Sequence, residues 1–325
     1  MLYSDISPRT NAYADRRLLT RSVPNNILGQ FGQVRELPSK STKTMMFRRY
    51  NKLAAATAPI AEGVTPVASA ITKTDLSVMI QQFGSWVMIT DVIQDTHEDP
   101  VLRESVDILG EQAGETYDLL RAGVLKAGTN VTYSNGAARD AVQTCISVEV
   151  LKRIDRYLLR QEAKRMRSIV QAGPNISTRP IAEAYIVVCH CDLKYDLEAM
   201  TGWIPVQEYA TQGGQIQGEI GAWGNFRFVI DNNLTAWADA GAAKLTMIST
   251  TGTYADIYPV LIFGRDAYGL VPLGGKNSVS TYVNNPKASD SDPLAQRGTC
   301  GWKGYHACVI LNDLWMMRLE CGCTA

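Results

Sequence analysis

The chain has 325 residues and a mass of 35.7 kDa, with 46% hydrophobic and 20% charged residues. This composition is sufficient for one large or two ordinary domains and excludes a disordered chain. The 32 basic side chains balance 32 acidic ones, so net charge indicates neither a nucleic-acid nor a membrane partner.

No apolar run is long enough to cross a bilayer, and the N-terminal residues predict no signal peptide. The seven cysteines are scattered, which is typical of a reducing cytoplasm and not of a disulfide framework. We therefore expect a soluble, globular protein made in the cytoplasm.

The first 53 residues form a basic lead, with ten basic side chains against three acidic ones. Closely spaced prolines and glycines in this lead support no long helix. Two interpretations remain open: the lead is disordered, or it is an arm that becomes ordered against another subunit.

A long hairpin follows the lead. Residues 43–50, 75–83 and 85–90 are rich in β-formers and predict its strands. Residues 54–72 between them are small, almost uncharged and interrupted by Pro59, Gly63 and Pro66. This tip can bury too little surface to hold itself in place, so we expect it to be mobile in the free chain and covered by another chain on assembly.

The clearest helix is predicted over residues 100–126. Asp99 is a favourable N-cap, Pro100 a favourable first residue and Gly128 a suitable terminator. One apolar stripe runs along it at steps of three or four residues: Leu102, Val106, Leu109, Ala113, Tyr117, Leu120 and Val124. Nothing on this helix indicates catalysis, so we interpret it as a structural spine.

A second helix is predicted over residues 147–171, with an apolar face and a basic face. The basic face consists of Lys152, Arg156, Arg160, Lys164 and Arg167. It is either a solvated surface or a face directed at packed nucleic acid or an acidic neighbour.

The remainder indicates a mixed α/β region with a short helix over residues 192–200. Strands are predicted at residues 184–190, 226–230, 244–249, 258–263, 305–311 and 314–320. The glycine-rich residues 213–224 match neither a phosphate-binding loop nor a dinucleotide-binding turn, and no nucleophile elbow occurs.

Two cysteine pairs could supply zinc ligands together with a histidine, Cys189-His190-Cys191 and Cys321-Gly322-Cys323. Their spacing is shorter than that of common zinc sites, and on a strand His190 would face away from its neighbours. Buried reduced thiols are the favoured interpretation. We expect no metal, no cofactor and no catalytic residue, although an enzyme is not excluded by the sequence.

Several stretches resemble the major capsid proteins of tailed phages of the N-four type, and together they follow the family order over most of residues 100–320. They are IFGRDAYGLVPLGG (262–275), DPLAQRGTCGWKGYH (292–306), VILNDLWMMRLE (309–320), and YIVVCHCD (185–192) with GWIPVQEY (202–209). The cysteines at 191, 300, 308, 321 and 323 depart from the small, apolar or proline residues expected there.

The resemblance implies the α+β Hong Kong 97 (HK97) capsid fold, with an N-terminal arm, an extended loop, a peripheral domain and an axial domain. By analogy the arm covers residues 1–42, the extended loop 43–95, the peripheral domain with its spine helix 96–144 and the axial domain 145–295. Residues 296–325 would be C-terminal strands returning to the peripheral domain.

The implied function is structural: copies of the chain assemble as hexamers and pentamers into an icosahedral shell around double-stranded DNA. The implied partners are other copies, DNA held without sequence specificity, a portal protein and scaffolding or decoration proteins, with no membrane. The protein would be assembled in the host cytoplasm and reside in the virion. The alternative is a cellular nanocompartment shell of the encapsulin type.

Two groups of site residues are predicted under this interpretation. The basic stripe from Lys152 to Arg167 would face the lumen. Contacts between subunits would be made by Arg16, Arg17, Met45, Phe47, Phe83 and Trp86.

Overall fold

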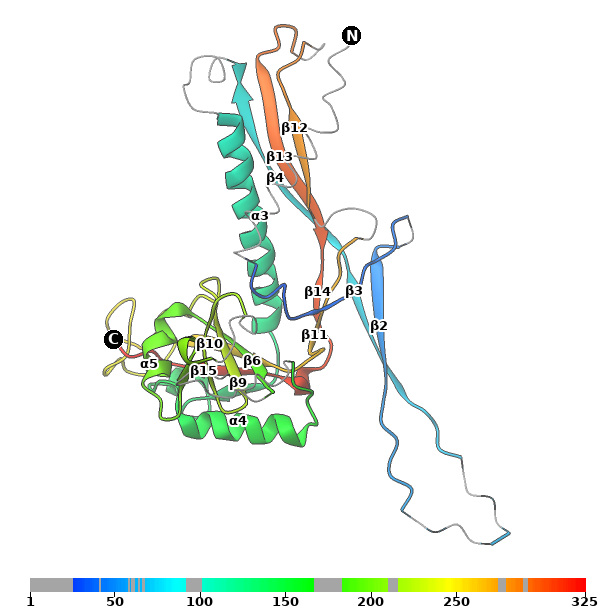
Figure 1. The fold of residues 1–325 in the computed structure, drawn as a ribbon, viewed down its shortest axis with the longest axis vertical. Coiled ribbons are helices and arrows are strands. Elements are labelled where there is room, and N and C mark those ends of the chain that lie inside the picture. Colours follow the sequence, from blue (N-terminus) through cyan, green and yellow to red (C-terminus); the bar gives the residue numbers. More distant parts are fainter. Residues whose placement is uncertain are drawn as a thin grey trace.

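The structure is a computed structural model that describes residues 26–40, 42–57, 59, 62–63, 65, 68–91, 101–166, 183–209, 216–273, 279–288 and 292–325. A tall helix and a three-stranded sheet rise from a mixed α/β body, and a hairpin projects from their junction (Figure 1). Among the described helices, none combines the length and apolar character needed to cross a membrane.

The tall helix is α3 (Val101–Lys126), which confirms the predicted spine. Asp99 and Pro100 lie outside the described residues. The apolar stripe packs against a sheet with the order β12 (Val279–Asn284), β13 (Arg297–His306), β4 (Gln81–Thr90). Tyr117 meets the ring of Trp302 edge-on, with centroids 5.8 Å apart, so the stripe fixes the helix to the sheet.

The mixed body is built on a seven-stranded sheet. Its strand order is β5 (Val131–Tyr133), β15 (Met316–Cys321), β10 (Tyr258–Phe263), β6 (Tyr185–Cys189), β9 (Phe226–Ile230), β8 (Glu219–Trp223), β7 (Ile204–Pro205). The pairs β6–β9 and β15–β5 are parallel and the others antiparallel. The predicted strands at 226–230 and 258–263 are confirmed.

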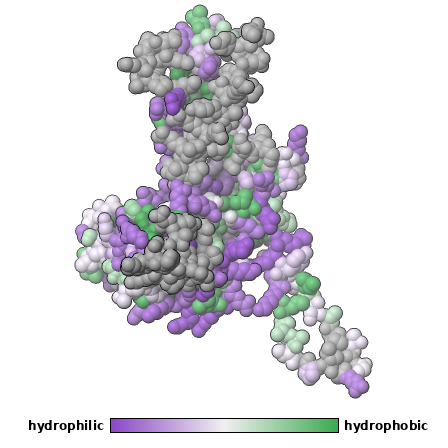
Figure 2. Space-filling view, viewed as in Figure 1, coloured by the Kyte–Doolittle hydropathy of each residue, from purple (hydrophilic) through white to green (hydrophobic). Residues whose placement is uncertain are grey.

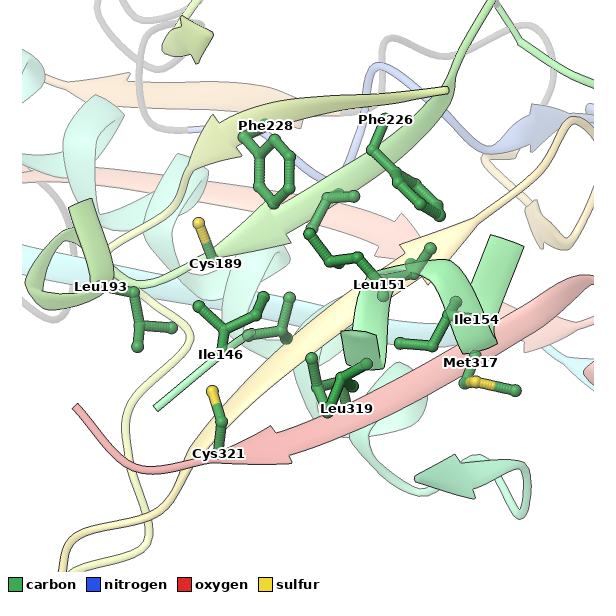
Figure 3. Close-up of a cluster of buried hydrophobic side chains, with 14 of the residues drawn as sticks. Ile146, Leu151, Ile154, Cys189, Leu193, Phe226, Phe228, Met317, Leu319 and Cys321 are labelled. Carbon is green, nitrogen blue, oxygen red and sulfur yellow. The ribbon is translucent and has the colours of Figure 1, made fainter. Parts of the chain in front are cut away.

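Both faces of this sheet are covered, as its uniformly buried central strands require. On one face, Leu151 and Ile154 of α4 (Val148–Arg160) pack among side chains such as Phe226 and Leu319 (Figure 3). On the other face, the last turns of α3 and residues 27–31 cover Ile186 and Val188. Successive residues of β6 therefore contribute to opposite cores.

Helix α4 is shorter than predicted and ends at Arg160 instead of residue 171. Glu162 adopts a left-handed backbone conformation with φ of 52°, and the N–H of Ala163 donates to the carbonyl of Leu158. This turn ends the helix at a glutamate, a residue that gives no sequence signal for a left-handed terminus.

The described part of the predicted arm packs on its own chain. Leu28 is fully buried and Phe31 is 6% exposed in the core under α3. β1 (Gln33–Val34) then joins β11 (Tyr268–Leu270) and β14 (Cys308–Ile310) in a second three-stranded sheet. The lead was expected either to be disordered or to pack on another subunit. Residues 26–37 do neither, because they pack on the core of their own chain.

The projecting hairpin consists of β2 (Thr44–Tyr50) and β3 (Lys73–Met79), paired in antiparallel register. After β3 the chain continues directly into β4 beside α3. The predicted strand at 43–50 thus forms one side of the hairpin. The predicted strand at 75–83 is divided: residues 75–79 lie in β3, whereas 81–83 join the predicted strand 85–90 in the sheet on α3.

Three strands join sheets outside the domain in which the prediction placed them. β15, expected to return to the peripheral domain, pairs with β10 in the seven-stranded sheet, and β5 pairs with β15. β12, placed in the axial range, pairs with β13 next to α3.

Residues 244–249 form no strand, because Leu245 has a φ of 46° and the N–H of Met247 turns back to the carbonyl of Lys244. The remaining short helices are η2 (Arg139–Ala141), η3 (Cys191–Leu193), α5 (Lys194–Glu198), η4 (Val206–Glu208) and η6 (Asp313–Trp315).

Candidate assembly surfaces

The hairpin has one face packed on its own chain and one face open. Met45 and Phe47 pack against Leu37 and Val271 at its base. On the opposite face Met46 and Met79 are 55% and 57% exposed. Beyond the paired strands, residues 51–57 and 68–72 are all exposed. The outer half of the hairpin therefore makes little contact with the rest of its own chain.

A second open apolar surface lies on the sheet beside α3. Alternation along β4 directs Phe83 and Ile89 towards the helix, whereas Trp86 and Met88 point away and are 65% and 52% exposed. Tyr282 on β12 lies on the same side and is 46% exposed. Large aromatic side chains left this open are typical of protein contact sites.

This surface contains a groove of about 660 Å³ lined by Trp86, Tyr282 and two glycines. A Cβ atom on Gly84 would lie 2.6 Å from the carbonyl oxygen of Trp302, and one on Gly301 would lie 2.8 Å from Trp86 Cβ. The strands can approach each other only because these positions lack side chains. We call Trp86, Met88, Tyr282 and this groove the outer sheet surface.

The predicted contact residues thus fall into three groups. Arg16 and Arg17 lie outside the described residues. Met45, Phe47 and Phe83 are directed mainly into their own chain. Trp86 presents most of its side chain to solvent. Sequence alternation alone did not show which side of each strand would face the core.

The basic stripe is exposed along α4 and just beyond it. Lys152, Arg156, Arg160 and Lys164 are exposed, and Arg167 lies outside the described residues. Figure 2 shows hydrophilic residues along the lower edge of the body, where Figure 1 places α4. Among ion pairs between described residues, none involves the first three of these side chains. Their positive charge is therefore available to an external anion.

Two buried carboxylates that sequence analysis missed hold the body together. Glu219 receives Arg227 Nε and Nη2 at 2.6 Å each, the hydroxyl of Tyr209 at 2.7 Å and the N–H of Ile216 at 2.9 Å. Glu320, which is fully buried, receives both Arg139 and Arg318. Glu219 and Arg227 lie on the paired strands β8 and β9, whereas Arg139 reaches Glu320 from a distant segment.

Arg318 has a further role at the end of α3. Its guanidinium donates to the carbonyl oxygens of Lys126 and Gly128. A cation at this position satisfies free carbonyls and interacts favourably with the helix dipole. The sequence signal was only the Gly128 terminator.

The cysteines are free thiols, and several are deeply buried. Burial raises the pKa of Cys189 and of Cys308 to about 12, so these thiols stay protonated and weakly reactive near neutral pH. The expectation of reduced thiols agrees with this environment.

The strand argument about His190 was wrong, because β6 ends at Cys189 and His190 caps η3. His190 Nδ1 lies 3.1 Å from Asp192 Oδ2 and 3.7 Å from Cys191 Sγ. These three side chains are the described group that could hold a metal ion. Local hydrogen bonds account for their arrangement, because Asp192 N–H donates to His190 Nδ1 and the Tyr258 hydroxyl donates to Asp192.

Comparison with known proteins agrees with this geometry. The chain is similar in fold to the capsid of Ralstonia phage GP4, with a TM-score of 0.66 and 13% identity over 90% of this chain and 87% of the other. The capsid of cyanophage P-SCSP1u gives a TM-score of 0.63 and 15% identity over 91% and 88% of the two chains. The architecture is therefore an α+β, HK97-like capsid fold, as predicted.

A family model described as "Phage capsid protein" matches residues 72–316. The major capsid protein of Pseudomonas phage KPP21 is 26% identical over an alignment of 224 residues that covers 63% of this chain and 56% of that protein. The match thus spans little more than half the length of this relative. The chain belongs to the phage capsid protein family, and the nanocompartment alternative is not favoured.

Proposed function

We propose that this chain is a structural major capsid protein without catalytic activity, and that its copies assemble as hexamers and pentamers into an icosahedral shell around double-stranded DNA. The observation that carries the proposal is the projecting hairpin, whose outer half is exposed and makes little contact with its own chain. An isolated two-stranded hairpin is marginally stable in water. A neighbouring copy that covers it would supply the missing burial.

The outer sheet surface supports the same conclusion energetically. Trp86 is 65% exposed, and a tryptophan side chain carries on the order of 250 Å² of surface. At about 25 cal/mol per Å², covering the exposed part would contribute up to about 4 kcal/mol per copy. In a closed shell each copy makes the same contact, so modest contributions are repeated throughout the assembly.

We propose a domain division that follows strand pairing. The peripheral domain is α3 with β4, β12 and β13, and the axial domain is the seven-stranded sheet with α4 and α5. The arm is then the part of residues 1–42 that precedes the packed segment at 26–37. β2, β3 and the loop between them form the extended loop.

The basic stripe from Lys152 to Lys164 is the proposed DNA-facing surface. Lysine and arginine on a helix attract phosphate without reading sequence. A portal protein and scaffolding or decoration proteins are further proposed partners, and the virion is the proposed location, reached by assembly in the host cytoplasm.

Hydrogen exchange on the hairpin tests the proposal. In unassembled protein the backbone amides of residues 52–57 and 68–72 should exchange within the dead time, and in shells they should be protected. The amides of α3 serve as the internal control, because they should be protected in both states. Equal protection of the loop in the two states would contradict assembly through the extended loop.

A test of the role of the arm in assembly needs a deletion that is shorter than the whole lead. Removing residues 2–25 should leave a folded subunit that forms shells of the wrong size or none. Removing residues 2–40 would also strip Leu28, Phe31 and Leu37 from the chain's own core, so a folding defect there would say nothing about assembly. Normal shells from the shorter deletion would show that the arm is dispensable.

A further inference from the structure

Two carboxylates meet in the interior where α3 faces the end of β9. Asp118 on α3 is fully buried, and Asp231, the residue after β9, is 3% exposed. Asn233 contacts both of them. Its backbone N–H donates to Asp231 Oδ1 at 2.9 Å, and its side-chain Nδ2 donates to Asp118 Oδ2 at 3.2 Å. Two buried acidic groups are therefore held together by one asparagine.

One oxygen of the pair has no hydrogen-bond donor. Asp118 Oδ1 accepts the N–H of Leu28 at 2.9 Å, so three of the four carboxylate oxygens have a donor. Asp231 Oδ2 is buried and has none. A proton on this oxygen would turn it into a donor towards Asp118 and would remove the repulsion between two like charges.

The nearby cations make their hydrogen bonds elsewhere, and Arg121 interacts with the pair through charge alone: burial lowers the pKa of Arg121, and the charge of Asp118 opposes that shift. Arg121 on α3 donates to His306 Nε2 at 3.2 Å and to Asn26 Oδ1. Lys126, also on α3, donates to the carbonyl oxygen of Thr235 at 2.9 Å. Among ion pairs of the described residues, none joins either cation to Asp118 or Asp231.

The other titratable neighbours are acidic or neutral. Glu115 of α3 and Glu219 of β8 line the cavity of about 620 Å³ beside Asp231, and Glu219 is paired with Arg227. On β6, the carbonyl of Cys189 accepts the N–H of Asp231, and burial raises the pKa of the Cys189 thiol to about 12. The surroundings therefore favour a neutral carboxyl over a second buried charge.

We propose that Asp118 and Asp231 share one proton and form a latch that joins α3, the segment at residues 26–31 and the seven-stranded sheet. With the proton bound, the pair links β9 to α3 and keeps the Leu28 amide hydrogen-bonded. When the proton is lost, two buried carboxylates repel each other and this junction loosens. The latch concerns a contact within one chain and does not depend on the proposed function.

A bound cation is the competing explanation, and the geometry does not favour it. Divalent cations such as calcium take six or more oxygen ligands. N–H donors already occupy three of the four oxygens, and the described residues supply no third carboxylate, cysteine or histidine close enough to complete a ligand group with this pair. One missing proton accounts for the one unpaired oxygen.

The electrostatics agree with this geometry. Burial, and then the negative charge of Asp118, raise the pKa of Asp231 to about 7, against the opposing effects of the Asn233 N–H and of the charge of Lys126. The folded chain therefore holds a proton that the unfolded chain releases near the ordinary value of 3.8. The shared proton therefore stabilises the folded chain fully at pH values near 3.8 and below, and this stabilisation is lost as pH rises through about 7.

Asp231→Asn tests the latch, because the amide keeps the size of the carboxyl and donates permanently to Asp118. Unfolding by urea is measured from pH 5 to pH 8. The unfolding constant of the wild type divided by that of Asp231→Asn should rise about tenfold per pH unit up to about pH 7 and then level off. Asp140→Asn, at an exposed position, is the matched control and should give a flat ratio. A flat ratio for Asp231→Asn as well would overturn the proposal.

A second measurement uses the wild-type protein, so it does not depend on whether a variant folds. In protein labelled with ¹³C at the aspartate carboxyl groups, one resonance should titrate near neutral pH, and the Leu28 amide should exchange faster above that pH after correction for intrinsic rates. Titration of all aspartates below about pH 5 would contradict shared protonation. Calcium that stabilises the wild type at pH 8, but not Asp231→Asn, would identify a cation site and also overturn the latch.

Discussion

Replacing Glu219 by glutamine should destabilise the axial body strongly. Glu219 and Arg227 are 0% and 2% exposed at their side chains and meet at 2.6 Å. The carboxylate accepts four hydrogen bonds, two from Arg227, one from the Tyr209 hydroxyl and one from the Ile216 N–H. All of its acceptor capacity is therefore in use.

The magnitude follows from the donors left without a partner. In Glu219→Gln an NH₂ group replaces one oxygen, so two of the four donors lose their acceptor. Each buried donor left unsatisfied costs about 1–3 kcal/mol. The total agrees with the roughly 3–5 kcal/mol observed when one partner of a buried ion pair is removed. Arg227→Met should cost a similar amount, because it leaves the carboxylate charge uncompensated.

Equilibrium urea unfolding of Glu219→Gln, Arg227→Met and the double variant Glu219→Gln/Arg227→Met measures these costs. The double variant should lose clearly less than the sum of the single losses, because no unpaired charge remains in it. Glu162→Gln is the control. It breaks the ion pair with Lys52, in which the Lys52 side chain is 82% exposed and the Glu162 side chain 75% exposed. This change should have little effect on the free energy of unfolding. Additive losses, or a loss below about 1 kcal/mol for Glu219→Gln, would refute the reasoning.

Three further predictions concern the core, pH and DNA. Leu151→Ala, at a fully buried position of α4, should lower the unfolding free energy by about 2–5 kcal/mol in urea. Burial, and then the charge of Arg121, lower the pKa of His306 to about 3. The unfolded chain therefore takes up a proton below about pH 6.5 that the folded chain excludes. Wild-type stability from this site is present above that pH and is lost as pH falls, and His306→Gln should flatten the decline in the urea midpoint. Changing Lys152, Arg156 and Arg160 to glutamine should leave shells intact but reduce their DNA content, measured by the ratio of absorbance at 260 and 280 nm; a failure to assemble would place the stripe at a subunit contact.

Elements with a strong local pattern could be predicted from the sequence. The apolar stripe, with Asp99 and Pro100 before it and Gly128 after it, predicted the bounds of α3 closely, and Val106, Leu109, Ala113 and Tyr117 all pack on one sheet. The buried runs at 226–230 and 258–263 were also correct, since central strands are apolar on both faces.

Features set by tertiary contacts could not be predicted. The end of α4 depends on the backbone of Glu162, and the turn at Leu245 replaces a strand that propensity favoured. Which faces of the hairpin and of β4 are open depends on partners such as Leu37 and Cys300, which are distant in sequence. The Asp118–Asp231 pair unites residues on α3 and after β9, and neither segment signals the other.

Electron microscopy of the purified chain, produced without other phage proteins and then with them, tests the central claim most directly. The proposed function predicts closed icosahedral shells in at least the second case, with the extended loop of each copy lying across a neighbour. Loss of these shells in Trp86→Ala, with subunit stability unchanged, would support the outer sheet surface as a contact. A chain that stays monomeric in both cases, with a folded core, would contradict the claim that it builds a capsid.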